Sequence, residues 1–109
     1  MDKHILFYST NLIAAPVPFD EALLKGLAPD KGLFMPEYIP RMEKDEILAL
    51  TDMEYPEIAF RVASKFLQGV ITDDKLLAIT KDAYDYEVPL EHVYDRNYVM
   101  RLDQGPTAS

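Results

Sequence analysis

The sequence contains no cysteine and no tryptophan, and only four glycines and two histidines. Without thiols, a disulfide scaffold, a thiolate metal site and a cysteine nucleophile are all excluded. Basic residues are also scarce, because eleven lysines and arginines stand against nineteen aspartates and glutamates, a net charge of −8. Such a surface repels phosphate groups, so we expect no nucleic-acid partner and no binding to an anionic membrane. The longest apolar run, residues 12–17, is far shorter than the roughly 20 residues that cross a bilayer.

The remaining composition is that of an ordinary globular domain. Hydrophobic residues make up 49% of the 109 residues and charged residues 28%, enough for a single core. No repeat, linker or charge block divides the chain, so we expect one domain over residues 1–109. The first four residues do not resemble an export signal, and we expect a cytoplasmic protein.

Prolines and glycines divide the first forty residues into short elements, whereas the second half favours longer helices. Residues 55–67 give the clearest helix, with apolar side chains at i, i+3, i+4, i+7 and i+8. Residues 90–94 and 98–102 flank three polar residues, which predicts a β-hairpin with a three-residue turn. The expected elements are a strand at His4–Ser9, helices at Phe19–Lys25, Glu43–Leu50, Tyr55–Leu67 and from Thr72 to Ala83, and the hairpin at Leu90–Leu102. The sequence therefore predicts an α+β fold: a small helix-rich domain with three to four main helices and a few short strands, including the C-terminal β-hairpin.

Buried residues are also predicted for the helix at 43–50 and for the helix that begins at Thr72. Thr72 is the expected cap of the helix that follows it, and Pro89 prevents that helix from continuing. On the helix at 43–50, the residues expected to be partly buried are Ile47, Leu48 and Leu50. On the helix after Thr72, the inner face is expected to consist of Leu76, Ile79, Thr80 and Ala83.

Few residues suggest chemistry of their own. His4 and His92 lie in strand-like runs with no carboxylate at a metal-site spacing, so we expect no metal site. No G-x-S-x-G, Walker loop or G-x-G-x-x-G motif occurs. Acidic pairs within residues 43–46 and at 73–74 suit helix starts, and the seven tyrosines suit core packing. These residues alone predict a small acidic domain without a self-contained active site.

Two stretches together resemble the N-terminal region of the threonine synthases, a family of pyridoxal-phosphate enzymes. The first combines Tyr8-Ser9-Thr10-Asn11 with residues 17–36, VPFDEALLKGLAPDKGLFMP. It is similar to the family's Y-S-T opening and its F-x-E-A-L-L-x-G-L-A-P-D-x-G-L-[YF]-x-P motif. The second, residues 102–109 (LDQGPTAS), is similar to the family's G-P-T-x-x-F-K-D loop. The resemblance spans nearly the whole chain.

The resemblance implies a parent enzyme that converts O-phospho-L-homoserine and water to L-threonine and phosphate with pyridoxal phosphate. In the family, the lysine after the second motif forms the Schiff base with the cofactor, and it would lie just beyond Ser109. The seven lysines of this chain match no such motif. The resemblance therefore implies no catalytic residue in this chain and no cofactor bound by the chain alone. It places four residues in a positioning role beside the cofactor: Gly105, Pro106, Thr107 and Ser109.

We accordingly expect this chain to be the leading piece of a longer polypeptide, with the catalytic domain of the same protein as its partner. Apolar surface at the final hairpin then predicts concentration-dependent self-association, which sedimentation would detect. One departure from the family is Gln104, where a histidine is frequent, because glutamine does not titrate. Two alternatives stay open: a threonine-synthase-like relative with altered chemistry, and a non-enzymatic acidic module that binds another protein.

Overall fold

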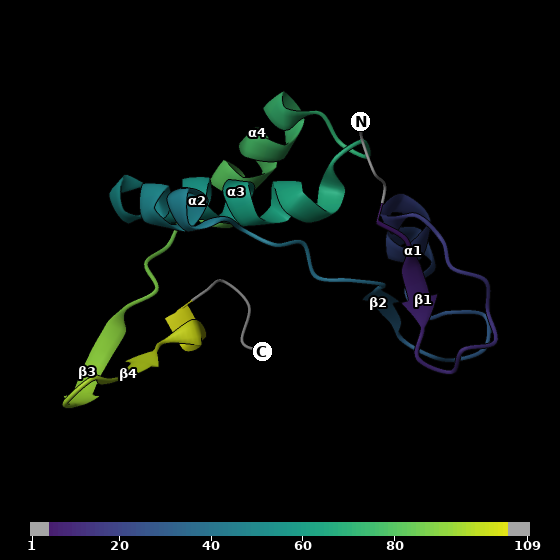
Figure 1. Ribbon diagram of the computed structural model, residues 1–109, viewed down its shortest axis with the longest axis horizontal. Coiled ribbons are helices and arrows are strands. Elements are labelled where there is room, and N and C mark those ends of the chain that lie inside the picture. The colour runs from purple at the N-terminus through teal and green to yellow at the C-terminus, as the bar shows by residue number, and fades with distance from the viewer. Residues whose placement is uncertain (1–4, 105–109) are drawn as a thin grey trace.

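The computed structural model describes residues 5–104 and contains four α-helices and two small antiparallel sheets within that range (Figure 1). This confirms the predicted α+β fold with its C-terminal hairpin. The elements, in chain order, are β1 (Phe7–Ser9), α1 (Phe19–Lys25), β2 (Phe34–Pro36), α2 (Lys44–Ala49), the 3-10 turn η1 (Leu50–Asp52), α3 (Tyr55–Leu67), α4 (Asp73–Ala83), β3 (Leu90–Tyr94), β4 (Asn97–Met100) and the 3-10 turn η2 (Leu102–Gln104).

The N-terminal unit is formed by β1, α1 and β2. The two strands pair antiparallel, with Phe7 opposite Pro36 and Ser9 opposite Phe34. Phe7 also exchanges two backbone hydrogen bonds with Val17, of 2.7 and 3.0 Å. Helix α1 ends at Gly26, whose φ of 75° is the left-handed conformation expected of a glycine there. The local pattern of apolar residues and chain breakers therefore predicts α1 correctly, whereas the first strand begins at Phe7, later than predicted.

The buried core of the N-terminal unit is small. It consists of Ile5, Phe7 and Ala22, and the rings of Phe7 and Phe19 meet edge to face with centroids 5.6 Å apart. Phe66, near the end of α3, packs against the same cluster. This side chain connects the N-terminal unit to the helices.

The helical unit is built around α3, against which α4 packs. Pro56 lies in the first turn of α3, where a missing N–H costs nothing. Glu46 of α2 forms an ion pair with Lys65 of α3, and this bond is the main reason that the pKa of Glu46 is lowered. A polar contact therefore joins α2 to α3.

The predicted buried faces of α2 and α4 are partly wrong. Ile47 and Leu48 are 52% and 55% exposed, and Ile79 is 52% exposed. Ala83 is exposed as well, whereas Leu76 and Thr80 are buried at 4% and 3%. Helical periodicity identifies the apolar side of a helix, but it does not say whether another element covers that side. On α4, the buried side chains Leu76 and Thr80 lie on a helix that packs against α3.

The turn of the C-terminal hairpin is shorter than predicted. Tyr94 pairs with Asn97, so the loop contains only Asp95 and Arg96 rather than three residues. Asp95 has a φ of 49°, and an irregularity between His92 and Tyr94 leaves one residue of β3 without a partner. Asn97, which the sequence pattern assigns to the turn, is instead the first residue of β4, and the bulge at Val93 lies on the opposite strand. The second strand also ends two residues earlier than predicted, at Met100.

The molecule is elongated. Its radius of gyration is 16.3 Å, whereas a compact chain of this length has roughly 13 Å. Figure 1 shows the N-terminal unit at one end of the long axis, α2, α3 and α4 together, and the hairpin standing apart from both. Every residue of β3 and β4 is exposed. Within residues 5–104, none of the helices has the length and hydrophobicity that crossing a membrane requires.

Candidate functional site

The predicted cofactor-adjacent residues, Gly105, Pro106, Thr107 and Ser109, lie outside the described residues. The structure describes the hairpin that leads to them. Arg101 follows β4 and donates hydrogen bonds to Glu91 on β3, at 2.6 Å, and to both carboxylate oxygens of Asp103, at 2.9 Å. Asp103 and then Glu91 hold the pKa of Arg101 above its usual range. This ion-pair cluster orients the chain as it leaves the hairpin, and sequence spacing alone does not indicate it.

Asp30 organises the first family-like motif. Its Oδ1 accepts hydrogen bonds from the hydroxyl of Ser9, at 2.5 Å, and from the N–H of Gly32, at 3.0 Å. Its Oδ2 accepts from the N–H groups of Ile13 and Ala14, at 3.1 and 2.8 Å. One carboxylate therefore satisfies donors from two loops and closes the connection between β1 and α1 onto the turn before β2.

The Tyr8-to-Asn11 stretch contacts the same turn through two further side chains. The Thr10 hydroxyl accepts a hydrogen bond from the N–H of Leu33, at 2.9 Å, and the Asn11 amide donates to the carbonyl of Asp30, at 2.9 Å. Polar residues of the motif are thus hydrogen-bonded to one another, a network that no sequence motif predicted. The serine, threonine and asparagine that follow a strand, with an aspartate-glycine turn twenty residues later, are the signal that would have indicated it.

Gly32 is required by the closeness of this contact. A Cβ built at Gly32 would lie 2.1 Å from the Ser9 Oγ and 2.9 Å from the backbone nitrogen of Asn11. Ser9 is completely buried, so its hydroxyl has no free space into which to move. The glycine is therefore part of the same polar network as Asp30.

These hydrogen bonds lower the pKa of Asp30. The Ser9 hydroxyl contributes most, followed by backbone N–H groups, and the pKa falls from 3.8 to about 2. The folded state consequently binds this proton less tightly than the unfolded chain does. The network's contribution to stability is complete above about pH 4 and is lost as the pH falls through 2.

We expect the urea midpoint of the chain to fall between pH 4 and pH 2. The Asp30→Asn variant should start from a lower midpoint and respond less to pH over this range, because it has no carboxylate to protonate. Asp20→Asn, which changes an exposed aspartate of α1 outside the network, should keep the pH response. Equal pH responses of the natural chain and Asp30→Asn would contradict the role given to this carboxylate.

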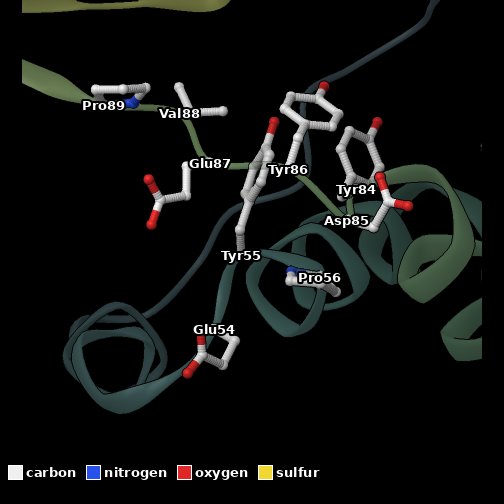
Figure 2. A pocket seen from close by; sticks show the side chains of 9 residues that line it. All are labelled: Glu54, Tyr55, Pro56, Tyr84, Asp85, Tyr86, Glu87, Val88 and Pro89. Atoms are coloured by element: carbon white, nitrogen blue, oxygen red, sulfur yellow. The ribbon is translucent and has the colours of Figure 1, made fainter. Parts of the chain in front are cut away.

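A second cluster lies where α3 begins. The ring of Tyr55 meets those of Tyr84 and Tyr86 edge to face, with centroids 5.1 and 5.8 Å apart. Burial, with Tyr86 as the next cause, raises the pKa of Tyr55. These rings line an open pocket of about 660 Å³ together with residues 54, 56, 85 and 87–89 (Figure 2). These three tyrosines are only partly buried and form the wall of a pocket. Tyr38, Tyr94 and Tyr98 are 46%, 63% and 54% exposed, so the predicted core packing does not hold for them.

No metal centre emerges from the described part of the chain. Among residues 5–104, no group of three or more histidine, aspartate and glutamate side chains is arranged to hold an ion. His92 makes a 2.7 Å hydrogen-bond contact with the carbonyl of Asp95, and its ring lies against Tyr98, so it serves the hairpin turn. His4 lies outside the described residues.

The fold and its contacts define a small α+β scaffold domain whose polar networks serve structure. A family model described as the threonine synthase N terminus matches residues 6–84. The threonine synthase of Pseudomonas aeruginosa is 36% identical over 106 residues, which are 93% of this chain and 23% of that protein. The threonine synthase of Schizosaccharomyces pombe is 34% identical, over 98% of this chain and 22% of that protein.

A crystal structure of threonine synthase from Brucella melitensis with bound pyridoxal phosphate has the same fold over this region. It matches with a TM-score of 0.84 and 31% identity, covering 95% of this chain and 24% of that one. The chain belongs to the threonine synthase family and corresponds to its N-terminal region. The resemblance deduced from the two motifs is therefore confirmed. The chain spans about a quarter of the length of the relatives that it matches.

Proposed function

We propose that this chain is the N-terminal part of a pyridoxal-phosphate-dependent threonine synthase. The complete enzyme would convert O-phospho-L-homoserine and water to L-threonine and phosphate, and this part would be a scaffold that catalyses nothing alone. The observation that carries the proposal is the match to the pyridoxal-phosphate-bound Brucella enzyme, at 31% identity over 95% of the chain. The proposed location is the cytoplasm.

The pocket between α3 and the segment 84–89 does not fit the cofactor. The pocket at Tyr55 is lined by three carboxylates and no lysine or arginine, so it offers neither a Schiff-base amine nor a cation for the cofactor phosphate. Lys65 lines another pocket, but its ammonium group is paired with Glu46. From the resemblance to the family's G-P-T-x-x-F-K-D loop, we propose that the cofactor lysine lies beyond Ser109, with Gly105, Pro106, Thr107 and Ser109 as the positioning loop next to it.

The exposed hairpin supports the proposed partner, the catalytic domain of the same polypeptide. A two-stranded hairpin is at best marginally stable by itself in water, yet β3 and β4 are exposed throughout. Among its apolar side chains, Leu90, Tyr94 and Met100 are each about 60% exposed. The catalytic domain would cover this surface in the complete enzyme. Without that cover, we propose that the same surface makes copies of this chain associate as concentration rises.

The test compares two polypeptides: this chain and the complete product of its gene. Each is incubated with pyridoxal phosphate and O-phospho-L-homoserine, and phosphate and threonine are measured, with L-homoserine as the substrate control that has no phosphate to lose. We expect equal amounts of phosphate and threonine from the complete protein and neither from the chain alone. Turnover by the chain alone, a complete protein without turnover, or a gene that ends at Ser109 would each overturn the proposal.

A further inference from the structure

The pocket at Tyr55 has a composition that fits one class of ligand. It lies between the start of α3 and the segment 84–89, which joins α4 to β3. Its volume of about 660 Å³ is that of a small-molecule or side-chain site. Nothing in the family-like motifs involves it, because they lie at residues 8–36 and 102–109. The pocket therefore needs an explanation of its own.

Aromatic faces form one wall of the pocket. The Tyr55 ring makes edge-to-face contacts with both Tyr84 and Tyr86 rather than stacking on either. In Figure 2 the Tyr55 ring stands between these two rings on one side and Glu87 on the other. The negative face of an aromatic ring attracts a cation within about 6 Å.

The charges at the pocket have one sign. Glu54, Asp85 and Glu87 line it, and no lysine, arginine or histidine does. None of these three carboxylates has an ion-pair partner within residues 5–104, although other acids of the chain, such as Glu46 and Glu91, pair with basic side chains. The pocket thus combines ring faces with uncompensated carboxylates, and both attract a cation and repel a phosphate.

We propose that the pocket binds an arginine side chain of the polypeptide that packs against this domain. The guanidinium would stack on the Tyr55 face and donate hydrogen bonds to Glu54 and Glu87. Arginine fits better than lysine because its planar group can stack on a ring and still donate five N–H groups in its plane. The inference rests on the proposed function for its partner, since the related enzymes are about four times as long as this chain and have the additional polypeptide to supply the arginine.

The experiment labels the chain with 3-fluorotyrosine and follows its ¹⁹F NMR signals, assigned by Tyr→Phe variants. N-acetyl-L-arginine amide is added at low salt, and N-acetyl-citrulline amide, its neutral analogue, is the control ligand. We expect saturable shifts at Tyr55, Tyr84 and Tyr86 with arginine and none at Tyr94 and Tyr98 of the hairpin. Equal shifts with citrulline, equal shifts of the hairpin tyrosines, or tighter binding of tetramethylammonium than of the arginine amide would each overturn the proposal.

Charge variants test the two carboxylates directly. Glu54→Gln combined with Glu87→Gln should weaken arginine binding about fivefold, because two rim ion pairs are lost. The matched control, Glu21→Gln with Glu57→Gln, removes two exposed carboxylates that do not line the pocket and should leave the affinity unchanged. Equal weakening by both pairs would mean that only net charge matters and would overturn the proposal.

The same titration of the complete polypeptide identifies the source of the arginine. If the rest of the polypeptide fills the pocket, the arginine amide should cause no saturable shift at Tyr55 there. Binding as strong as in the short chain would overturn the intramolecular occupant. If the complete protein lacks threonine synthase activity, the proposed function fails, but the binding of arginine by the short chain is still tested because that titration needs no catalysis.

Discussion

Replacement of Gly32 by alanine is expected to destabilise the chain by about 3 kcal/mol, the upper range for overpacking a close-packed site. The added Cβ would lie 2.1 Å from the Ser9 Oγ and 2.9 Å from the Asn11 nitrogen. Ser9 is completely buried and bonded to Asp30, so relief requires moving the backbone or breaking that bond. Urea unfolding followed by circular dichroism measures the loss.

Gly26→Ala is the matched control for this substitution. Gly26 has a φ of +75°, but a Cβ there would meet nothing within 4 Å. The substitution should therefore cost only the strain of a residue with positive φ, about 1–2 kcal/mol. A loss at Gly26 as large as that at Gly32 would show that backbone conformation, rather than the contact with Ser9, governs both sites.

Replacement of Leu76 by alanine is expected to cost about 3 kcal/mol, because it leaves a cavity in the pair formed by α3 and α4. Leu76 is 4% exposed on α4, which packs against α3. The same substitution at Ile79, which is three residues further along the helix and 52% exposed, should cost less than about 1 kcal/mol. Chemical denaturation of the two variants compares them directly. Equal losses would mean that Ile79 is covered in solution, as its helical spacing predicts.

The contrast between Leu76 and Ile79 illustrates what a periodic pattern can predict. Both side chains lie on the apolar side of α4, and the spacing of apolar residues correctly places the helix itself. Only the position of α3 decides which of the two is buried. The same reasoning applies to Ile47 and Leu48 of α2, since that short helix meets α3 through the Glu46–Lys65 ion pair.

The candidate sites divide in a similar way. Family-like motifs indicate the threonine synthase region and the loop at residues 105–109, which stays a prediction. They do not indicate that Asp30 collects four hydrogen bonds, because its partners Ser9, Ile13 and Ala14 are sixteen to twenty-one residues away along the chain. The sequence does not predict the tyrosine pocket either, because Tyr55 and Tyr84 come into contact only when α4 folds back on α3.

The amino-acid sequence by itself determined the order of helices and strands, the breaks at Gly26 and Pro89, and membership of the threonine synthase family. These properties depend on the spacing, backbone preferences and identities of residues that are close together in the sequence. Tertiary structure alone decided which apolar faces are covered, why Gly32 admits no side chain, and where carboxylates meet tyrosine rings. Such features arise from contacts between distant segments, and their energies depend on distances that exist only after the chain has folded.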